Sequence, residues 1–120
     1  MEELLALSFA LKSDLFTTVR LTAGGICARA GLSLDDAEDC KVCVTESLLL
    51  FMRNGYSSAR VQFAQDNGVC VRLTGENGRG AAGDSAEDEI SYSLLGALVE
   101  NLNVERKDGA VTEITFRFGS

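Results

Sequence analysis

Residues 33–56 read SLDDAEDCKVCVTESLLLFMRNGY and carry the clearest helix signal in the chain. Ser33 is a favourable N-cap residue, and Asp36 three positions later completes a capping box in its acidic variant. Apolar residues then recur at spacings of three and four, which is the period of an amphipathic helix. The pattern predicts a long helix over Leu34–Arg53, with the carboxylate of Glu46 at the edge of its apolar face.

The segment before this helix predicts a strand and a first helix. Residues 4–11 are apolar, with enough alternation to indicate a strand. Ser13 offers an N-cap for the helix that follows, and Gly31 is a signal for its C-terminal end. Gly24 and Gly25 fall inside this helix at a cost of about 1 kcal/mol each relative to alanine, which indicates a tight packing point or a kink.

The segment after the long helix predicts two hairpins around a third helix. Gly55 ends the long helix. Alternating apolar residues and turn signals define the remaining elements: strands Ala59–Ala64 and Val69–Leu73 joined by Asp66–Gly68, a loop over Gly75–Gly83, an acidic lead-in over Ser85–Glu89, a helix over Ile90–Asn101, and strands Val104–Lys107 and Val111–Phe118 joined by Asp108–Gly109. The predicted order of elements is therefore βααββαββ.

This order predicts an α+β fold. We expect a two-layer sandwich in which a mixed, mostly antiparallel sheet carries the helices on one face. The chain contains no proline, no low-complexity tract and no internal repeat, so nothing in it marks a domain boundary. Residues 1–120 are therefore expected to form one domain, which at this length buries roughly two thirds of its unfolded surface.

The charge balance excludes some classes of partner. Eighteen acidic and eleven basic residues give a formal net charge of -7, so nucleic acids and anionic membranes are repelled on average. The longest uncharged apolar run, Ser47–Met52, is too short to cross a bilayer, and two glutamates follow Met1 where a signal peptide needs positive charge. We expect a cytoplasmic protein that binds neither nucleic acid nor membrane.

The four cysteines fit reduced core thiols better than a metal or redox site. Cys40 and Cys43 form the one CxxC pair, and the chain has no second such pair and no histidine to complete a zinc site. Both residues lie inside the predicted long helix, where free cysteine usually behaves as a small buried hydrophobe. No metal ligands are assigned.

One segment resembles a family motif. The run Val44-Thr45-Glu46-Ser47, followed by Asn54-Gly55-Tyr56, resembles the N box of the GHKL (Bergerat-fold) ATPases. The form is the one found in the anti-sigma-factor serine kinases, where V-S-E-A-x-x-N is followed by H-G/A-Y. Arg20, Thr22 and Lys41 also fall where that family carries the same or similar residues, so the resemblance extends over essentially the whole chain.

The resemblance implies an ATP or ADP site with magnesium. In the family, the residue matching Glu46 is the general base toward a serine hydroxyl of the protein substrate. The family's magnesium-binding asparagine, four positions later, is replaced here by Leu50, which offers no oxygen to a hard cation. Asn54, in the second half of the motif, is carried over as a further nucleotide-site residue.

The two other nucleotide motifs are altered. The family's D-x-G-x-G appears as Glu76-Asn77-Gly78-Arg79-Gly80, so the resemblance implies that Glu76, Gly78 and Gly80 contact the nucleotide, with Glu76 at the adenine. The same glycine spacing also suits an ordinary loop. The phosphate-binding G-x-G-L run is absent, and Glu87–Tyr92 stands in its place with three carboxylates that repel a triphosphate.

Three functions remain open on these residues. The first is a degenerate regulatory domain that binds a sigma factor or an anti-anti-sigma protein, with Arg20 on the partner side, a homodimer through the sheet, and nucleotide binding weakened or lost. The second is an active ATP-dependent serine kinase in which Glu46 remains the base. The third is an ATP-binding domain detached from a histidine kinase, although a chain without histidine has no phosphoacceptor.

Overall fold

The computed structural model describes residues 2–78 and 86–119. The elements along the chain are strand β1 (Glu2–Ala10), the 3-10 turn η1 (Ser13–Leu15), helices α1 (Phe16–Arg29) and α2 (Leu34–Arg53), strands β2 (Tyr56–Gln65) and β3 (Gly68–Gly78), helix α3 (Ala86–Leu98), and strands β4 (Glu100–Lys107) and β5 (Ala110–Gly119). This order confirms the predicted βααββαββ arrangement. In the part of the chain that the structure describes, no helix is long and apolar enough to span a membrane.

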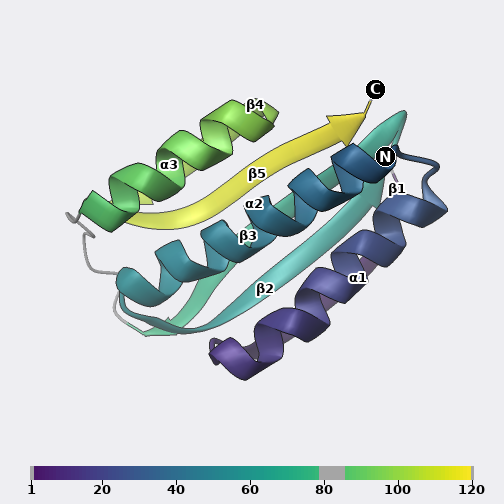
Figure 1. The fold of residues 1–120 in the computed structure, drawn as a ribbon. Coiled ribbons are helices and arrows are strands. Elements are labelled where there is room, and N and C mark those ends of the chain that lie inside the picture. Colours follow the sequence, from purple (N-terminus) through teal and green to yellow (C-terminus); the bar gives the residue numbers. More distant parts are fainter. Residues whose placement is uncertain (1, 79–85, 120) are drawn as a thin grey trace.

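The fold is the predicted two-layer α+β sandwich, with one difference in the sheet. The strands lie in the order β1-β2-β3-β5-β4, and the three helices cover one face of the sheet (Figure 1). All four strand pairings are antiparallel, whereas the sequence predicted a mixed, mostly antiparallel sheet. The reason lies partly in the two hairpins, because β2–β3 and β4–β5 are joined by two-residue turns that only antiparallel neighbours allow.

The core lies between α2 and the central strands. Alternate residues of β2, β3 and β5 point toward the helices and are buried: Ala59, Val61, Phe63, Val69, Val71, Leu73, Ile114, Phe116 and Phe118. From α2, Val44, Leu48 and Phe51 are fully buried against them. The second half of the central helix is therefore held against the sheet by apolar contact.

Both ends of α2 follow the sequence signals. The Ser33 hydroxyl accepts a hydrogen bond of 3.1 Å from the backbone N–H of Asp36, which confirms the predicted cap. The helix spans the predicted residues Leu34–Arg53. Gly55 has a φ of 87°, and this left-handed backbone turns the chain into β2.

The start of the first helix differs from the prediction. Ser13 does not cap it, because residues 13–15 form the 3-10 turn η1 and α1 begins only at Phe16. The backbone N–H of Leu15 bonds to the carbonyl of Lys12 at 2.9 Å, so a backbone turn takes the place of a side-chain cap. Gly31 ends the helix as predicted, with a φ of 76°.

Strand β3 ends later than predicted, and helix α3 begins earlier than predicted. Gly75 and Gly78 belong to β3, where they pair with Ala59 and Tyr56, so the start of the predicted loop is strand. Gly75 fits because a Cβ there would lie 2.6 Å from the Tyr56 ring. Helix α3 begins at Ala86, so the acidic lead-in forms its first turn, where carboxylates interact favourably with the helix dipole.

Candidate functional site

The candidate site lies where the second half of α2 packs against α3. Glu46 is half-buried on α2, at the edge of the apolar face as predicted. The Ser91 hydroxyl of α3 donates a hydrogen bond of 3.1 Å to Glu46 Oε1. The same hydroxyl oxygen accepts a hydrogen bond of 2.6 Å from Nη2 of Arg53, one of the last residues of α2. Glu46 therefore faces a serine hydroxyl of its own chain.

An ion pair continues these contacts across the two helices. Arg53 Nε donates to Asp88 Oδ1, and the Asn54 side-chain amide donates to Asp88 Oδ2 at 3.3 Å. Asn54 also donates to the carbonyl of Leu50 at 2.9 Å and accepts from the backbone N–H of Val111 at 3.1 Å. We call Glu46, Arg53, Asn54, Asp88 and Ser91 the α2–α3 polar network.

Most residues of the α2–α3 polar network are buried, so losing one partner destabilises the fold. Asn54, Asp88 and Ser91 are each 1% exposed, and the Arg53 side chain is 23% exposed. Removing one partner of a buried ion pair costs about 3–5 kcal/mol, because the other charge is left uncompensated. The network therefore fastens α3 to α2 at the position of Glu46.

Leu50 is part of the apolar core. Its side chain has no exposed surface, and it packs within the same hydrophobic cluster as Leu48 and Phe51. The side chain therefore presents no surface to a ligand in this structure. Its backbone carbonyl contacts the network only as the acceptor for Asn54.

The structure does not bring Glu76 together with Glu46. In β3, Leu73 is buried against the helices, and a Cβ on Gly75 would point to the Tyr56 ring, so the alternation places Glu76 on the helix-free face. Its carbonyl accepts a hydrogen bond of 3.2 Å from the Ser58 hydroxyl.

The two glycines of the same motif are placed differently. A Cβ on Gly78, whose φ is 151°, would lie 2.5 Å from the carbonyl oxygen of Gly55, so a close backbone approach accounts for this glycine. Gly80 lies outside the described residues.

Arg20 lies on α1 with an exposed side chain, as a partner contact requires. Arg53, Asp88 and Ser91 were not predicted as individual site residues from the sequence, although Asp88 and Ser91 lie in the segment Glu87–Tyr92 that replaces the phosphate-binding run. One signal was present: residues 88, 91, 95 and 98 follow helical spacing, so Asp88 and Ser91 belong to the buried stripe of α3. A polar residue in the buried stripe of a helix indicates a hydrogen bond or ion pair to another element.

Three cysteines lie in the core. Cys27, Cys40 and Cys43 are fully buried, and Cys70 is half-buried on the sheet. Burial raises the pKa of the Cys43 thiol to about 12, so it stays protonated at neutral pH. Within residues 2–78 and 86–119, no group of cysteine, aspartate and glutamate side chains could hold a metal ion.

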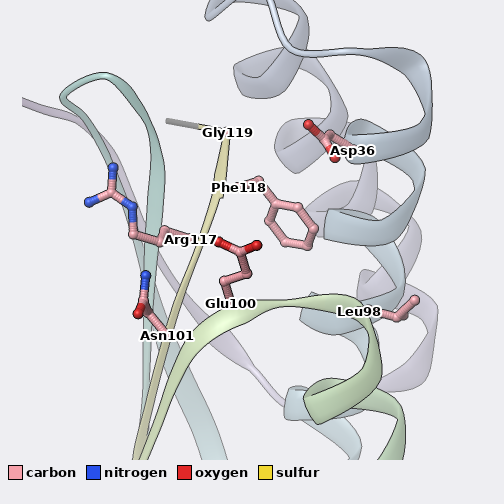
Figure 2. Close-up of a pocket in the computed structure, with 7 residues that line it drawn as sticks. All are labelled: Asp36, Leu98, Glu100, Asn101, Arg117, Phe118 and Gly119. Carbon is pink, nitrogen blue, oxygen red and sulfur yellow. The ribbon is translucent and has the colours of Figure 1, made fainter.

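A cavity of about 520 Å³ lies at the other end of α2 from Arg53 (Figure 2). Leu98 and Phe118 give it apolar walls, and Asp36 and Glu100 give it carboxylates. Arg117, which also lines it, forms two hydrogen bonds of 2.8 and 3.0 Å to Asp66. This cavity shares no residue with the α2–α3 polar network.

The fold and the place of Glu46 on α2 agree with the class indicated by the N-box resemblance, the anti-sigma-factor serine kinases. Three curated sequences named serine-protein kinase RsbW, all from Staphylococcus epidermidis, are each 27% identical to this chain over 96 residues. The similarity covers 78% of this chain and 59% of each relative, so the chain spans little more than half their length. No family model matches the chain. This similarity supports a relationship between the chain and the anti-sigma-factor serine kinases.

Proposed function

We propose that this chain is a regulatory domain of the anti-sigma-factor type, which binds a sigma factor or an anti-anti-sigma protein and in which nucleotide binding is weakened or lost. The α2–α3 polar network is the observation that carries the proposal, because it joins the two helices beside Glu46 through buried groups that already pair with each other. The similarity to serine-protein kinase RsbW supports the regulatory class.

A nucleotide at this site would compete with the network. By the resemblance, its phosphates would lie between Glu46 and the start of α3, which is where Arg53 and Asp88 pair. Nucleotide binding there requires the two helices to separate and the contacts of the network to break. The free energy of that separation is subtracted from the free energy of binding, so the affinity for nucleotide is lowered.

The charge at the start of α3 acts in the same direction. Asp88 is buried and paired with Arg53, but Glu87 and Glu89 place two exposed carboxylates in the same first turn, where they repel the phosphates of ATP. Leu50 adds no oxygen ligand for magnesium. The proposed weakening therefore has three physical causes: a filled site, a missing metal ligand and like charge.

The alternative function is a working ATP-dependent serine kinase, and one contact favours it. Glu46 Oε1 accepts a hydrogen bond from a serine hydroxyl at 3.1 Å, which is the geometry that a general base needs toward a substrate serine. Transfer of labelled phosphate from ATP to a purified anti-anti-sigma protein, abolished by Glu46→Gln, would establish the kinase and reject the proposed loss of nucleotide binding.

Partner binding tests the regulatory role. The sigma factors and anti-anti-sigma proteins of the source organism are titrated by calorimetry, without nucleotide and with Mg-ATP. We expect at least one to bind, with affinities that agree within about twofold between the two conditions. Arg20→Ala should weaken that complex at least about tenfold, and Arg29→Ala, on the same helix, is the matched control. No binding by any of them, or binding only with Mg-ATP, contradicts the proposal.

We further propose that the domain acts in the cytoplasm as a homodimer paired through the helix-free face of the sheet. A depression of about 470 Å³ on that face, which a second sheet could approach, is lined by the small side chains of Ala64, Cys70 and Thr115 together with the longer polar side chains of Glu3, Gln62 and Arg72. Sedimentation equilibrium should give a dimer, and Thr115→Arg should shift it toward monomer. A wild-type chain that sediments only as a monomer contradicts the homodimer.

A further inference from the structure

Asparagine is followed by glycine at three places in the chain, residues 54–55, 67–68 and 77–78. In this dipeptide the backbone nitrogen of glycine can attack the side-chain carbonyl carbon of asparagine, because glycine has no Cβ to hinder the approach. The product is a succinimide ring, which water opens to aspartate or isoaspartate. The reaction in a folded chain depends on how firmly each asparagine is held, and the three sites differ in this respect.

Asn54 is held in the core by its side chain. The residue is 1% exposed. Its amide donates to the Leu50 carbonyl and to Asp88, and its side-chain oxygen accepts a hydrogen bond from the backbone N–H of Val111. Rotating the side chain toward Gly55 breaks these buried hydrogen bonds, so reaction at Asn54 requires the fold to open.

Asn77 is exposed but is fastened to the neighbouring strand. Its amide donates a hydrogen bond of 2.7 Å to the Ser58 hydroxyl, and its carbonyl accepts one from the Ser57 hydroxyl. Gly78, which carries the attacking nitrogen, pairs with Tyr56 at the end of β3. The last residues of β3 must therefore detach from β2 before the ring can form at Asn77.

Asn67 is exposed at the tip of the β2–β3 hairpin. Within residues 2–78 and 86–119, its side chain forms no hydrogen bond. The backbone N–H of Gly68 donates to Asp66 Oδ1 at 3.1 Å, so a carboxylate that can accept the proton lies beside the attacking nitrogen. Hydrogen bonds from Arg117 and Gly68 lower the pKa of Asp66, so this carboxylate is ionised at neutral pH.

We propose that Asn67 is a deamidation site of the folded protein, at which the β2–β3 turn is converted to isoaspartate with time. The Gly68 nitrogen bonds to the side-chain carbonyl carbon of Asn67, and its proton passes to the Asp66 carboxylate. The side-chain nitrogen of Asn67 then leaves with that proton as ammonia. Water opens the succinimide, so one water molecule is taken up and one ammonia is released, and no oxidant, reductant or cofactor takes part.

The isoaspartyl product lengthens the main chain where the backbone is tightly packed. A Cβ on Gly68 would overlap the carbonyl oxygen of Phe118, so β3 and β5 leave no free space there. An added main-chain methylene before Gly68 must displace this residue from β5. The same displacement moves Asp66 away from Arg117, which joins the turn to β5 through two hydrogen bonds. Isoaspartate at position 67 therefore destabilises this end of the sheet.

Peptide mapping tests the proposed order of reactivity. Trypsin cuts after arginine and separates the three sites into peptides 54–60, 61–72 and 73–79. The chain is kept at neutral pH, and mass spectrometry follows the replacement of NH2 by OH, with fragment ions to assign it to asparagine. In the folded chain, peptide 61–72 should deamidate at least about tenfold faster than the other two, because its site needs no opening.

The same measurement in urea is the control. Unfolding frees all three asparagines, and each is followed by glycine, so the three rates should then agree within about threefold. Equal rates in the folded chain overturn the proposal, as does a faster reaction at Asn54 or Asn77.

Two glutamine variants test the isoaspartyl product. Glutamine at position 67 would have to close a larger ring, and Asn77→Gln is the matched control. The probe is a purified protein L-isoaspartate methyltransferase, which methylates isoaspartate but not aspartate. Aged wild type and aged Asn77→Gln should accept labelled methyl groups equally, and aged Asn67→Gln should lose most of the label. Undiminished labelling of Asn67→Gln overturns isoaspartate formation at this turn.

The effect on the turn is measured separately. The deamidated chain has one more negative charge and is isolated by anion exchange. It should melt several degrees below Asn67→Asp, which has the same charge and an ordinary main chain. Equal melting temperatures overturn the proposed destabilisation. Neither nucleotide nor a partner protein enters these experiments, so their outcome is independent of the proposed regulatory function.

Discussion

Arg53 is the residue on which the α2–α3 polar network depends most. It lies at the end of α2 and donates to Asp88 and to Ser91, both on α3. Asp88 is buried, so its carboxylate is not solvated by water. It accepts hydrogen bonds from the Arg53 guanidinium and from the side-chain amide of Asn54 instead. One side chain thus holds together two helices that are distant in sequence.

Replacing Arg53 should therefore destabilise the fold strongly. Arg53→Ala leaves the buried Asp88 without its counter-charge, and we expect a loss of about 3–5 kcal/mol, which lowers the melting temperature by more than about 10 °C. The control is Arg72→Ala, because Arg72 is 56% exposed in its pair with Glu113 and such a pair contributes less than about 1 kcal/mol. Equal losses for the two variants, measured by thermal unfolding, would contradict the role of the network.

Gly78 gives a second prediction at this scale. The resemblance assigns it to the nucleotide site, but its φ of 151° and the 2.5 Å approach to the Gly55 carbonyl give it a structural role. Gly78→Ala should cost about 1–3 kcal/mol in urea unfolding without any ligand present. Gly96→Ala, in an exposed helical position, should instead stabilise by about 0.5–1 kcal/mol. If Gly78→Ala leaves the free energy of unfolding unchanged, the structural role is wrong and only the nucleotide-binding role remains for this glycine.

Among the elements, those with local signals were predicted best. The ends of α2 follow from Ser33 and from the apolar period, both of which depend only on residues a few positions apart. Ser13 has the same chemistry as Ser33 but caps nothing, because it lies in the backbone-bonded turn Ser13–Leu15 that precedes α1. The face of the sheet that Glu76 occupies depends on how β3 pairs with β2, which the motif itself does not contain.

The β2–β3 turn is fastened to β5 by one ion pair, and this contact predicts a pH effect. Hydrogen bonds from Arg117 and the backbone of Gly68 lower the pKa of Asp66 below its ordinary value of 3.8. The contact therefore stabilises the fold above pH 3.8 and is lost as the pH falls through the lower folded pKa. In acid unfolding, Asp66→Asn should be less stable than wild type near pH 6 and converge with it in strong acid. A constant difference at all pH values would contradict this assignment.

At the scale of the whole molecule, the fold class and the order of elements could be predicted, while the state of the site could not. The N-box match places Glu46 on a helix, but neither the network nor its burial is visible until α3 lies against α2. Asp88 is one of three acidic residues in a row, and only the packing of α3 shows which of them is buried. The same applies to Leu50. The sequence marks it only as a missing magnesium ligand, and the structure shows that its side chain is buried in the core.

The most direct test of the central claim is a titration of Mg-ATP and Mg-ADP against the melting temperature of the wild-type chain. A ligand at a hundred times its Kd stabilises by about 2.7 kcal/mol, which is a shift of several degrees for a domain of this size. The account predicts no shift at millimolar nucleotide. A magnesium-dependent shift of several degrees, increased further by Leu50→Asn, would contradict it and would support the kinase.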